Sequence, residues 1–510
     1  MVSLQKVVLA LALYGGVRAA AFQPANFRKE EGLSLSPLVT GIEPSKTIEV
    51  HALTQAMRAA GQEVVSLCVG EPDFPPPAPI LAATEEAVKQ GLTKYTAVSG
   101  TAPLRQAIAA HLEERKGTVY DPASEILLGN GAKQAVYQAI LATCRPGDEV
   151  ILPAPYWPSY PEIVKLAGGT PVVVETKCEE GYILQPEALA AALSPKTRML
   201  VLCNPSNPTG AVHDRAALQA LADVLASPEE HGPGAARCWV MADEIYERLV
   251  YDGVEHVAFA ALEGRSEAGR IPMWDRTLTV NGFSKAYAMT GYRLGYLAAP
   301  HAVVKACGTL QGQITSCASS VAQHAALAAL QLDEAKVLAP LVDDMAAKRD
   351  LVYNKLRAMH GVKVPDAPPS GAFYLLPEVD AFFGRRSPGR LVFGPAAGLG
   401  ASGSGLVDYD GMDPVTVGAD EAAESVAGGG GREIMDSTSL CVALLADTGV
   451  AFVPGEAFGA PRAVRLSYAA SREELVTALF RFEEWLLRTT AAGEDWKPIV
   501  TRNMAASASR

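Results

Sequence analysis

The chain has 510 residues, of which 49% are apolar, and it carries a net charge of -12. This length predicts a globular protein with a large core divided over at least two domains, and the negative charge argues against nucleic acid or an anionic membrane as a partner. The eight cysteines are scattered singly, with no C-x-x-C pair and no metal-ligand spacing, so we expect free core thiols in a reducing compartment and no metal site.

Residues 1–33 have the pattern of a targeting leader. Lys6 precedes the apolar run from Val7 to Leu13, and small residues follow Arg18. This is typical of a short signal peptide, and the run is too short to span a bilayer; a frayed apolar terminus is the alternative. The following Ala21-Phe22 junction resembles the bipartite plastid-targeting leaders of algae with secondary plastids. We therefore expect a mature form without a membrane anchor in the plastid stroma, or else in another compartment reached by a signal peptide.

The next segment predicts a helix and a strand. The helix is expected over residues 45–60, with Ser45 or Thr47 as its cap, and the strand over Val64 to Val69. The strand ends at Gly70, in the turn Gly-Glu-Pro-Asp-Phe, which as an isolated motif could be an ordinary proline-rich turn.

From residue 77 to about 330, short apolar runs alternate with helical stretches. This alternation predicts an α/β architecture with a mostly parallel sheet and helices on both faces. Ligands in such sheets bind at the carboxyl ends of the strands. Polar or aromatic residues follow four of the predicted strands: Gly131, Ala132 and Lys133 after Ile126–Leu128, Trp157 after Val150–Leu152, Asn207 after Met199–Cys203, and Asp243 and Tyr246 after Cys238–Ala242.

Each of these residues also has a structural interpretation. The glycines at 129 and 131 either form a tight turn or leave N–H groups free for an anion at a helix start. Trp157 is either a core residue or a ring-stacking platform, and Asn207 is either a turn asparagine or a fixed hydrogen-bond donor. Asp243 could cap a helix.

Lys285 and Arg293 follow the predicted strand Thr277–Val280. Pyridoxal phosphate (PLP) needs such a pair, an amine to react with its aldehyde and a guanidinium to hold its phosphate. The alternative is a surface lysine and a surface arginine on a loop, but the small residues between them are unusual for a solvated face.

The stretch around this pair, Asn-Gly-Phe-Ser-Lys-Ala-Tyr-Ala-Met-Thr-Gly-Tyr-Arg-Leu-Gly (281–295), closely resembles the PLP-lysine signature of class I aminotransferases. The resemblance covers roughly residues 34 to 490 and implies a fold type I PLP-dependent transferase. It implies a large PLP-binding domain at 77–330 and a smaller α+β domain at 331–494, joined by the N-terminal segment 34–76. The chain departs from the family at 384–432, where a Gly-, Ala- and Ser-rich composition predicts a surface insertion in the small domain, and we expect a disordered tail at 495–510.

The resemblance also implies the roles of individual residues. Lys285 is expected to be the catalytic Schiff-base residue. The cofactor phosphate is expected to be bound by Arg293, Gly131, Ala132 and Lys133, together with Tyr95 of a neighbouring subunit, which implies a homodimer with shared active sites. Where some subgroups carry a serine, this chain has Gly282, and Ser284 is the candidate replacement. The cofactor ring is expected to be held by Trp157, Asn207, Tyr246 and Asp243.

Arg465 lies among apolar residues in the predicted strand Val464–Tyr468. A buried guanidinium needs a partner. The resemblance makes that partner the substrate α-carboxylate, which would also meet the backbone at Gly70; an internal salt bridge is the alternative.

These expectations make the protein a PLP-dependent transaminase. Lys133 and Thr47 match positions in the prokaryotic-type branch of aspartate aminotransferases found in plastids, where they accompany use of prephenate as well as oxaloacetate. We therefore expect glutamate or aspartate to donate an amino group to oxaloacetate, 2-oxoglutarate or prephenate, the last giving arogenate. Lys133 could instead only neutralise the cofactor phosphate. The rivals are another fold type I enzyme, such as an aromatic or kynurenine-type aminotransferase or a C–S lyase, and a non-enzymatic PLP regulator, for which the chain lacks a basic DNA-binding module.

Overall fold

The computed structural model describes residues 35–267, 269–391, 393 and 431–491. The expected leader, most of the expected insertion and the expected tail lie outside these residues. Across the described ranges, no helix has both the length and the apolar character needed to cross a membrane.

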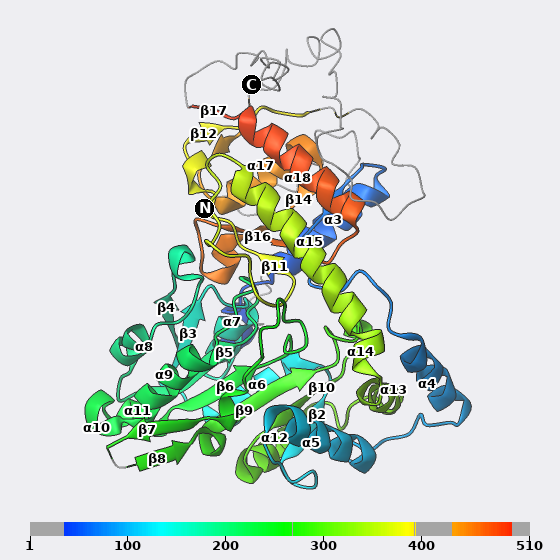
Figure 1. Cartoon of the computed structure of the whole chain (residues 1–510), viewed down its shortest axis with the longest axis vertical. Coiled ribbons are helices and arrows are strands. Elements are labelled where there is room, and N and C mark those ends of the chain that lie inside the picture. The colour runs from blue at the N-terminus through cyan, green and yellow to red at the C-terminus, as the bar shows by residue number, and fades with distance from the viewer. Residues whose placement is uncertain (1–34, 268, 392, 394–430, 492–510) are drawn as a thin grey trace, which may run out of the picture.

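A seven-stranded sheet forms the centre of the larger part of the molecule (Figure 1). Six of its strands run in the same direction and β10 runs against them, so the predicted mostly parallel sheet is confirmed. In spatial order the strands are β2 (Ile126–Gly129), β10 (Gly295–Ala298), β9 (Thr277–Gly282), β6 (Trp239–Asp243), β5 (Thr197–Cys203), β3 (Glu149–Ala154) and β4 (Thr170–Glu175).

Helices cover both faces of this sheet. Successive residues of a strand point to opposite faces, and in the inner strands both sets of residues are apolar. On β5, Met199 and Val201 pack with α6 (Ala132–Thr143), α7 (Ser159–Leu166) and α12 (His301–Ile314). Leu200 and Leu202 pack on the other side with α8 (Pro186–Ala192) and α9 (Arg215–Ala226). Most residues of the inner strands are therefore buried by one layer or the other, as expected for a parallel sheet, whereas the edge strand β4 exposes Thr170, Val173 and Glu175.

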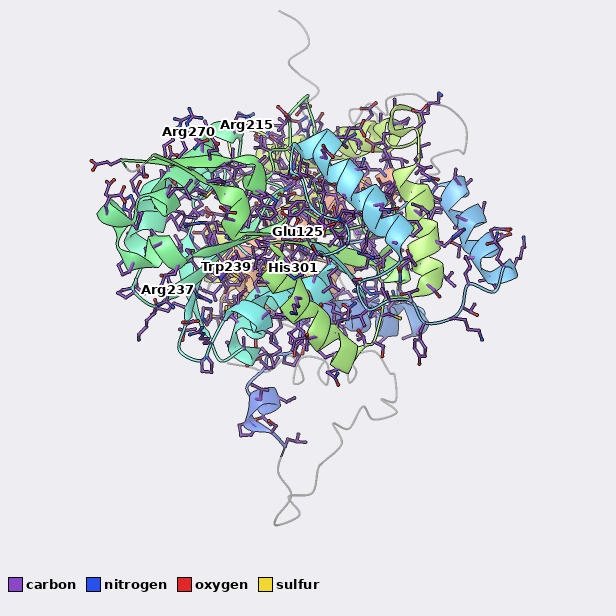
Figure 2. All side chains as sticks on the ribbon, turned by 90° about the horizontal axis from the view of Figure 1, so that it is seen from below. Glu125, Arg215, Arg237, Trp239, Arg270 and His301 are labelled. Atoms are coloured by element: carbon purple, nitrogen blue, oxygen red, sulfur yellow. The ribbon has the colours of Figure 1, made fainter. Side chains whose placement is uncertain are left out.

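Two further helices, α5 (Ala102–Lys116) and α13 (Ser320–Leu330), pack on β2 and β10 of the sheet. Figure 2 views the molecule from below and labels Glu125 and Trp239, which lie at the starts of β2 and β6. The other elements of the larger part are α4 (Ala78–Lys89), α10 (Pro228–His231), α11 (Pro233–Arg237), β7 (Glu263–Ser266) and β8 (Gly269–Pro272).

A smaller part lies above the large sheet in Figure 1, and α15 (Ala339–Ala358) runs between the two. Segments from both ends of the chain meet there, since β1 (Val65–Ser66) pairs in parallel with β14 (Val450–Ala451). Its other elements are α3 (Lys46–Ala59), α17 (Ser437–Thr448), α18 (Arg472–Leu487), β11 (Tyr374–Leu375), β12 (Arg385–Arg386), β13 (Glu433–Ile434), β15 (Val453–Pro454), β16 (Val464–Ser467) and β17 (Thr490–Ala491). The short helix α2 (Pro37–Thr40) precedes α3, and α14 (Glu334–Val337) lies at the lower end of α15, where Glu334 pairs with Arg115 and Arg248 of the larger part.

Two local predictions differ in part from the structure. The strand predicted over Val64–Val69 is only two residues long, because beyond Leu67 the backbone leaves the sheet and the carbonyl of Cys68 accepts a hydrogen bond from Arg465. The helix predicted over residues 45–60 forms as α3 with Ser45 at the N-cap position, one of the two candidates, but the Ser45 side chain accepts no cap hydrogen bond.

Candidate active site

The side chains that follow the strands of the large sheet meet at one edge. Because β10 is antiparallel, its first residue, Gly295, lies opposite the ends of both its neighbours, Gly129 of β2 and Gly282 of β9. Lys285 follows β9 and Arg293 precedes β10. The sheet topology therefore brings the amine and the guanidinium to the same edge as the start of α6.

Lys285 lies partly buried between the two parts of the molecule. Its Nζ donates to the carbonyl oxygen of Gly70 at 2.6 Å, and lies 5.9 Å and 6.0 Å from the ring centres of Tyr246 and Phe373. Burial lowers the pKa of Lys285 to about 8, and the positive charge of Arg465 acts in the same direction. An amine with this pKa is uncharged in a useful fraction of molecules near neutral pH, as a nucleophile or base requires.

The start of α6 forms an anion-binding cradle. Gly131, its N-cap, has φ of 86°, and a Cβ at this position would press against the guanidinium of Arg293. Lys133 lies in the first turn, with its Nζ 4.8 Å from the ring centre of Trp157, and its pKa is lowered by burial and by the charge of Arg293. Within the described part of the chain, no carboxylate pairs with Lys133 or Arg293. Two unpaired cations beside the free N–H groups of a helix start fit a phosphate.

Asp243, the last residue of β6, is a buried carboxylate, and no cation among the described residues makes a hydrogen bond or ion pair with it. It accepts hydrogen bonds from the Tyr160 hydroxyl at 2.6 Å and from the Ile245 amide at 3.3 Å. Burial raises the pKa of Asp243 from 3.8 to about 6. Such a carboxylate suits a positively charged ring nitrogen, which would favour its ionised form. No helix starts after Asp243, so the interpretation as a helix cap is wrong.

Arg465, on β16, is 2% exposed and lies between two aromatic rings. Its Cζ is 4.7 Å from the ring centre of Tyr374 and 4.8 Å from that of Phe458. It donates to Asn207 Oδ1 at 3.1 Å and to the carbonyl of Cys68, and its Nε has no partner. The alternative of an internal salt bridge is wrong for the described residues, since none supplies a carboxylate to Arg465. The guanidinium is thus held in place while its charge stays unpaired.

The other residues predicted for the site differ in how close they lie to its centre. The Asn207 side-chain oxygen accepts a hydrogen bond from Arg465, so its amide N–H groups remain for another acceptor. Ser284, which precedes Lys285 in the chain, is buried. Tyr95 is 89% exposed, and among the described residues its side chain forms no hydrogen bond or ring contact. A cleft of about 840 Å³ adjoins Lys133 and Arg293; Thr47 on α3 is not among its lining residues.

Three aromatic residues of this region were not assigned roles from the sequence: Tyr160, Tyr374 and Phe458. Tyr160 is three residues after Trp157 and packs edge-on against it, with ring centres 5.2 Å apart. Tyr374 places its hydroxyl 2.8 Å from that of Tyr246. The place of Tyr160 at the start of α7, in the segment that follows β3, was a usable signal, but nothing local in the sequence pairs Tyr374 with Tyr246.

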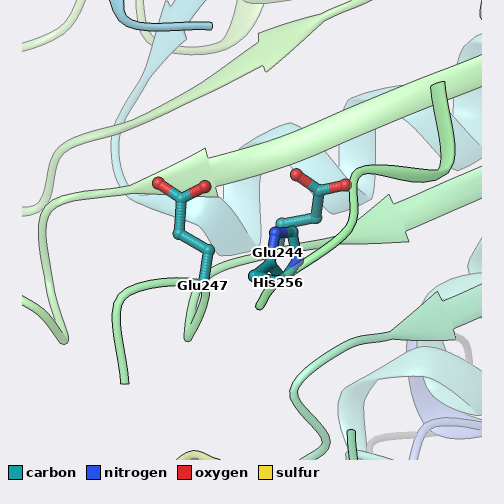
Figure 3. Close-up of side chains that lie close together, drawn as sticks. All are labelled: Glu244, Glu247 and His256. Carbon is teal, nitrogen blue, oxygen red and sulfur yellow. The ribbon is translucent and has the colours of Figure 1, made fainter. Parts of the chain in front are cut away.

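A buried charged cluster begins at Glu244, directly after Asp243. Glu244, Glu247 and His256 place ligand atoms within 4.8 Å of one another (Figure 3). Lys116 forms ion pairs with both carboxylates, and although burial opposes it, this lysine holds the pKa of Glu247 well below its ordinary value. The ammonium therefore supplies the positive charge that a metal would bring, and the cluster is explained as a structural ion-pair network.

The chain is similar to known proteins over most of its length. Residues 62–482 match the family model for class I and II aminotransferases. A bifunctional aspartate aminotransferase and glutamate/aspartate-prephenate aminotransferase from Petunia hybrida is 41% identical over 90% of this chain and 84% of its own length. An aspartate/prephenate aminotransferase from Cereibacter sphaeroides is 40% identical, over 88% and 98%.

Solved structures agree with this assignment. The aspartate aminotransferase of Rhizobium meliloti superposes with a TM-score of 0.74 at 35% identity, covering 90% of this chain and all of its own. The aspartate aminotransferase of Thermus thermophilus with maleate gives a TM-score of 0.71 at 35% identity, over 89% and 99%.

The residues of the site fit the cofactor of this family, PLP. An amine of lowered pKa, a phosphate-sized cluster of unpaired cations, a flat indole and an uncompensated carboxylate each match one part of that molecule. The chain belongs to the class I and II aminotransferases and is a PLP-dependent transaminase with the fold type I architecture.

Proposed function

We propose that this transaminase moves an amino group from glutamate or aspartate to dicarboxylic keto acids, namely oxaloacetate, 2-oxoglutarate and prephenate. The observation that supports this most directly is the pair of separate, unpaired cations, Arg465 and Lys133. One can take the α-carboxylate and the other the far carboxylate. The names of the Petunia and Cereibacter relatives include prephenate, and maleate, bound by the Thermus relative, is a dicarboxylate.

We propose the following catalytic and cofactor-binding roles for the residues of the site. Lys285 would hold the cofactor through its aldehyde and would act as the base that takes the proton from the substrate Cα and passes it to C4′, the aldehyde carbon of the cofactor, since its lowered pKa leaves the amine ready to accept one. PLP, when bound, supplies the electron sink that allows this proton to leave. Asp243 keeps the ring nitrogen protonated, while Asn207 and Tyr246 donate to the phenolic oxygen. Trp157 stacks on the ring.

The remaining roles concern binding. Arg293, Gly131, Ala132 and Ser284 hold the phosphate together with Lys133. Arg465 and the backbone at Gly70 hold the α-carboxylate. Lys133 is well suited to acids of different length, because an ammonium on a flexible stem can follow its partner where a guanidinium fork cannot. Thr47 is proposed to act at the same end of the substrate, near Lys46, which lines the cleft.

The test compares kcat/KM for prephenate, oxaloacetate and phenylpyruvate in the parent enzyme and in Lys133→Ala. Loss of a charge-assisted bond predicts a fall of roughly 10- to 100-fold for the two dicarboxylates and a smaller fall for phenylpyruvate. Lys165→Ala is the matched control, because Lys165 lines the same cleft but is paired with Glu162 at 2.7 Å. Equal losses for all three acceptors would mean that Lys133 only neutralises the phosphate, and a parent that ignores prephenate would refute the substrate assignment.

We propose that the enzyme is a homodimer with shared active sites, in which Tyr95 reaches the phosphate bound by the neighbouring subunit. Its 89% exposure supports this, since the side chain is unused within its own chain. Two inactive variants, Tyr95→Ala and Lys285→Ala, should regain activity when unfolded and refolded together, because a hybrid dimer has one complete site. If the mixture stays as inactive as its components, the sites are not shared.

We also propose the division of the chain that the sequence predicts: a leader at 1–33, an N-terminal segment at 34–76, a large domain at 77–330 and a small domain at 331–494. The leader is proposed to direct the protein to the plastid, and a plant enzyme is among its relatives. A fusion of residues 1–33 to a fluorescent protein should accumulate in plastids of a host with secondary plastids. Retention of the fusion in the ER would refute this destination.

A further inference from the structure

Tyr374 joins the two halves of the site. It is the first residue of β11, in the smaller part of the molecule, and is 1% exposed. Its hydroxyl oxygen lies 2.8 Å from that of Tyr246, in the turn after β6, and the two rings meet edge-on with centres 5.7 Å apart. A hydrogen bond between buried hydroxyls fixes the orientation of both groups, because no water competes for either.

The same tyrosine contacts the residues that face the substrate. The guanidinium of Arg465 lies 4.7 Å from the centre of its ring. Its hydroxyl also lies against Gly70, where a Cβ would overlap it, and the carbonyl of Gly70 accepts the hydrogen bond from Lys285 at 2.6 Å. Tyr374 therefore touches the side chain proposed to bind the α-carboxylate, the turn that contacts the catalytic amine and the tyrosine proposed to contact the cofactor.

The direction of the hydrogen bond follows from the charges. The positive charge of Arg465 lies over the ring of Tyr374 and makes the Tyr374 hydroxyl more acidic. Tyr374 is therefore the better hydrogen-bond donor of the pair. Burial raises the pKa of Tyr374 to about 12, which keeps its proton in place near neutral pH. If Tyr374 donates to Tyr246, the hydroxyl proton of Tyr246 is left free to point elsewhere.

We propose that Tyr374 is a positioning residue whose hydroxyl donates to Tyr246 and thereby directs the Tyr246 O–H toward the phenolic oxygen of the cofactor. This rests on the role proposed above for Tyr246. The bond also strengthens Tyr246 as a donor, since hydrogen bonds in a chain polarise one another. A stronger donor stabilises negative charge on the phenolic oxygen and lowers the proton affinity of the group that Lys285 forms with the cofactor.

The experiment is a pH titration of the visible absorbance of the PLP-loaded enzyme in Tyr374→Phe, Tyr246→Phe and the double variant. Loss of one neutral hydrogen bond predicts that the midpoint in Tyr374→Phe rises by about half a pH unit, with a fall of roughly three- to tenfold in kcat/KM. The double variant should match Tyr246→Phe, because Tyr374 acts only through Tyr246. The control is Tyr468→Phe, which removes a fully buried hydroxyl bonded to the Ala372 carbonyl at 3.1 Å and should leave the midpoint unchanged.

The outcomes separate the two proposals. A midpoint in Tyr374→Phe equal to that of the parent, while Tyr246→Phe shifts it, overturns the positioning role and leaves the proposed site intact. Shifts that add in full in the double variant also overturn it. If Tyr246→Phe itself has no effect on the midpoint, the role proposed for Tyr246 fails and the inference fails with it. Melting temperatures of all four variants show whether each protein is folded during the titration.

Discussion

Asp243→Asn is expected to stabilise the protein without its cofactor and to inactivate it with the cofactor. The carboxylate is 5% exposed, and its partners are the Tyr160 hydroxyl at 2.6 Å and the Ile245 amide at 3.3 Å, both neutral. Asparagine has the same shape and keeps an oxygen for Tyr160. The substitution therefore removes a buried charge while retaining the stronger hydrogen bond.

The size of the effect follows from the pKa of Asp243. Burial raises it from 3.8 to about 6, so folding favours the protonated carboxyl. The contribution of the protonated carboxyl to the free energy of unfolding is fully present below pH 3.8, and it is lost as the pH rises through 6 and the group ionises. Since one pKa unit is worth about 1.36 kcal/mol, the ionised carboxylate costs about 3 kcal/mol of unfolding free energy at pH 8 and about half of that at pH 5. Asparagine avoids this cost at both values.

The assay is thermal or urea unfolding of the cofactor-free parent and variant at pH 5 and pH 8. The variant should be more stable at both, by roughly twice as much at pH 8, which corresponds to a rise of roughly a few degrees in Tm. Transaminase activity of the loaded variant should fall by at least about a thousandfold, because an amide cannot keep the ring nitrogen protonated. A variant less stable than the parent at pH 8, or equally stabilised at both pH values, would refute the reasoning.

Three further changes have definite expected outcomes. Lys285→Ala should abolish both the visible absorbance of the attached cofactor and the transamination half-reaction, and near-normal turnover would exclude Lys285 as the catalytic residue. Lys116→Met should lower the unfolding free energy by about 3 to 5 kcal/mol, since it leaves the buried Glu244 without its cation and leaves Glu247 with Arg248 at 3.8 Å, whereas Lys89→Met, at an exposed pair with Glu85, should change it by less than about 1 kcal/mol. Replacing residues 394–430 with a short linker should preserve activity and Tm, because it keeps the hydrogen bonds of Leu391 and of Ser387 with Arg432, and the latter, at 2.8 Å, already holds the chain together on either side of the segment; a large fall in kcat without unfolding would instead show that the segment takes part in catalysis.

Local sequence predicted five of the seven strands of the large sheet, and missed β4 and the antiparallel β10. Apolar runs such as Met199–Cys203 predicted strands, and glycine and proline marked the turns after them, because backbone propensity and turn geometry depend on neighbouring residues. The rule that ligands bind at strand ends then predicted which turns carry polar groups. The strand ends observed at Gly129, Cys203, Asp243 and Gly282 lead directly to those turns.

The partners of the site residues were decided only by tertiary structure. Asp243 meets Tyr160, which is 83 positions away, and Tyr246 meets Tyr374, which is 128 positions away. Both contacts depend on how helices and the smaller part pack on the sheet, and no periodicity encodes such distances. The same holds for Lys116, whose place between Glu244 and Glu247 is set by the packing of α5 against the sheet. Sequence alone predicted which residue types the chemistry needs, whereas packing determined which groups remain charged, unpaired and able to act.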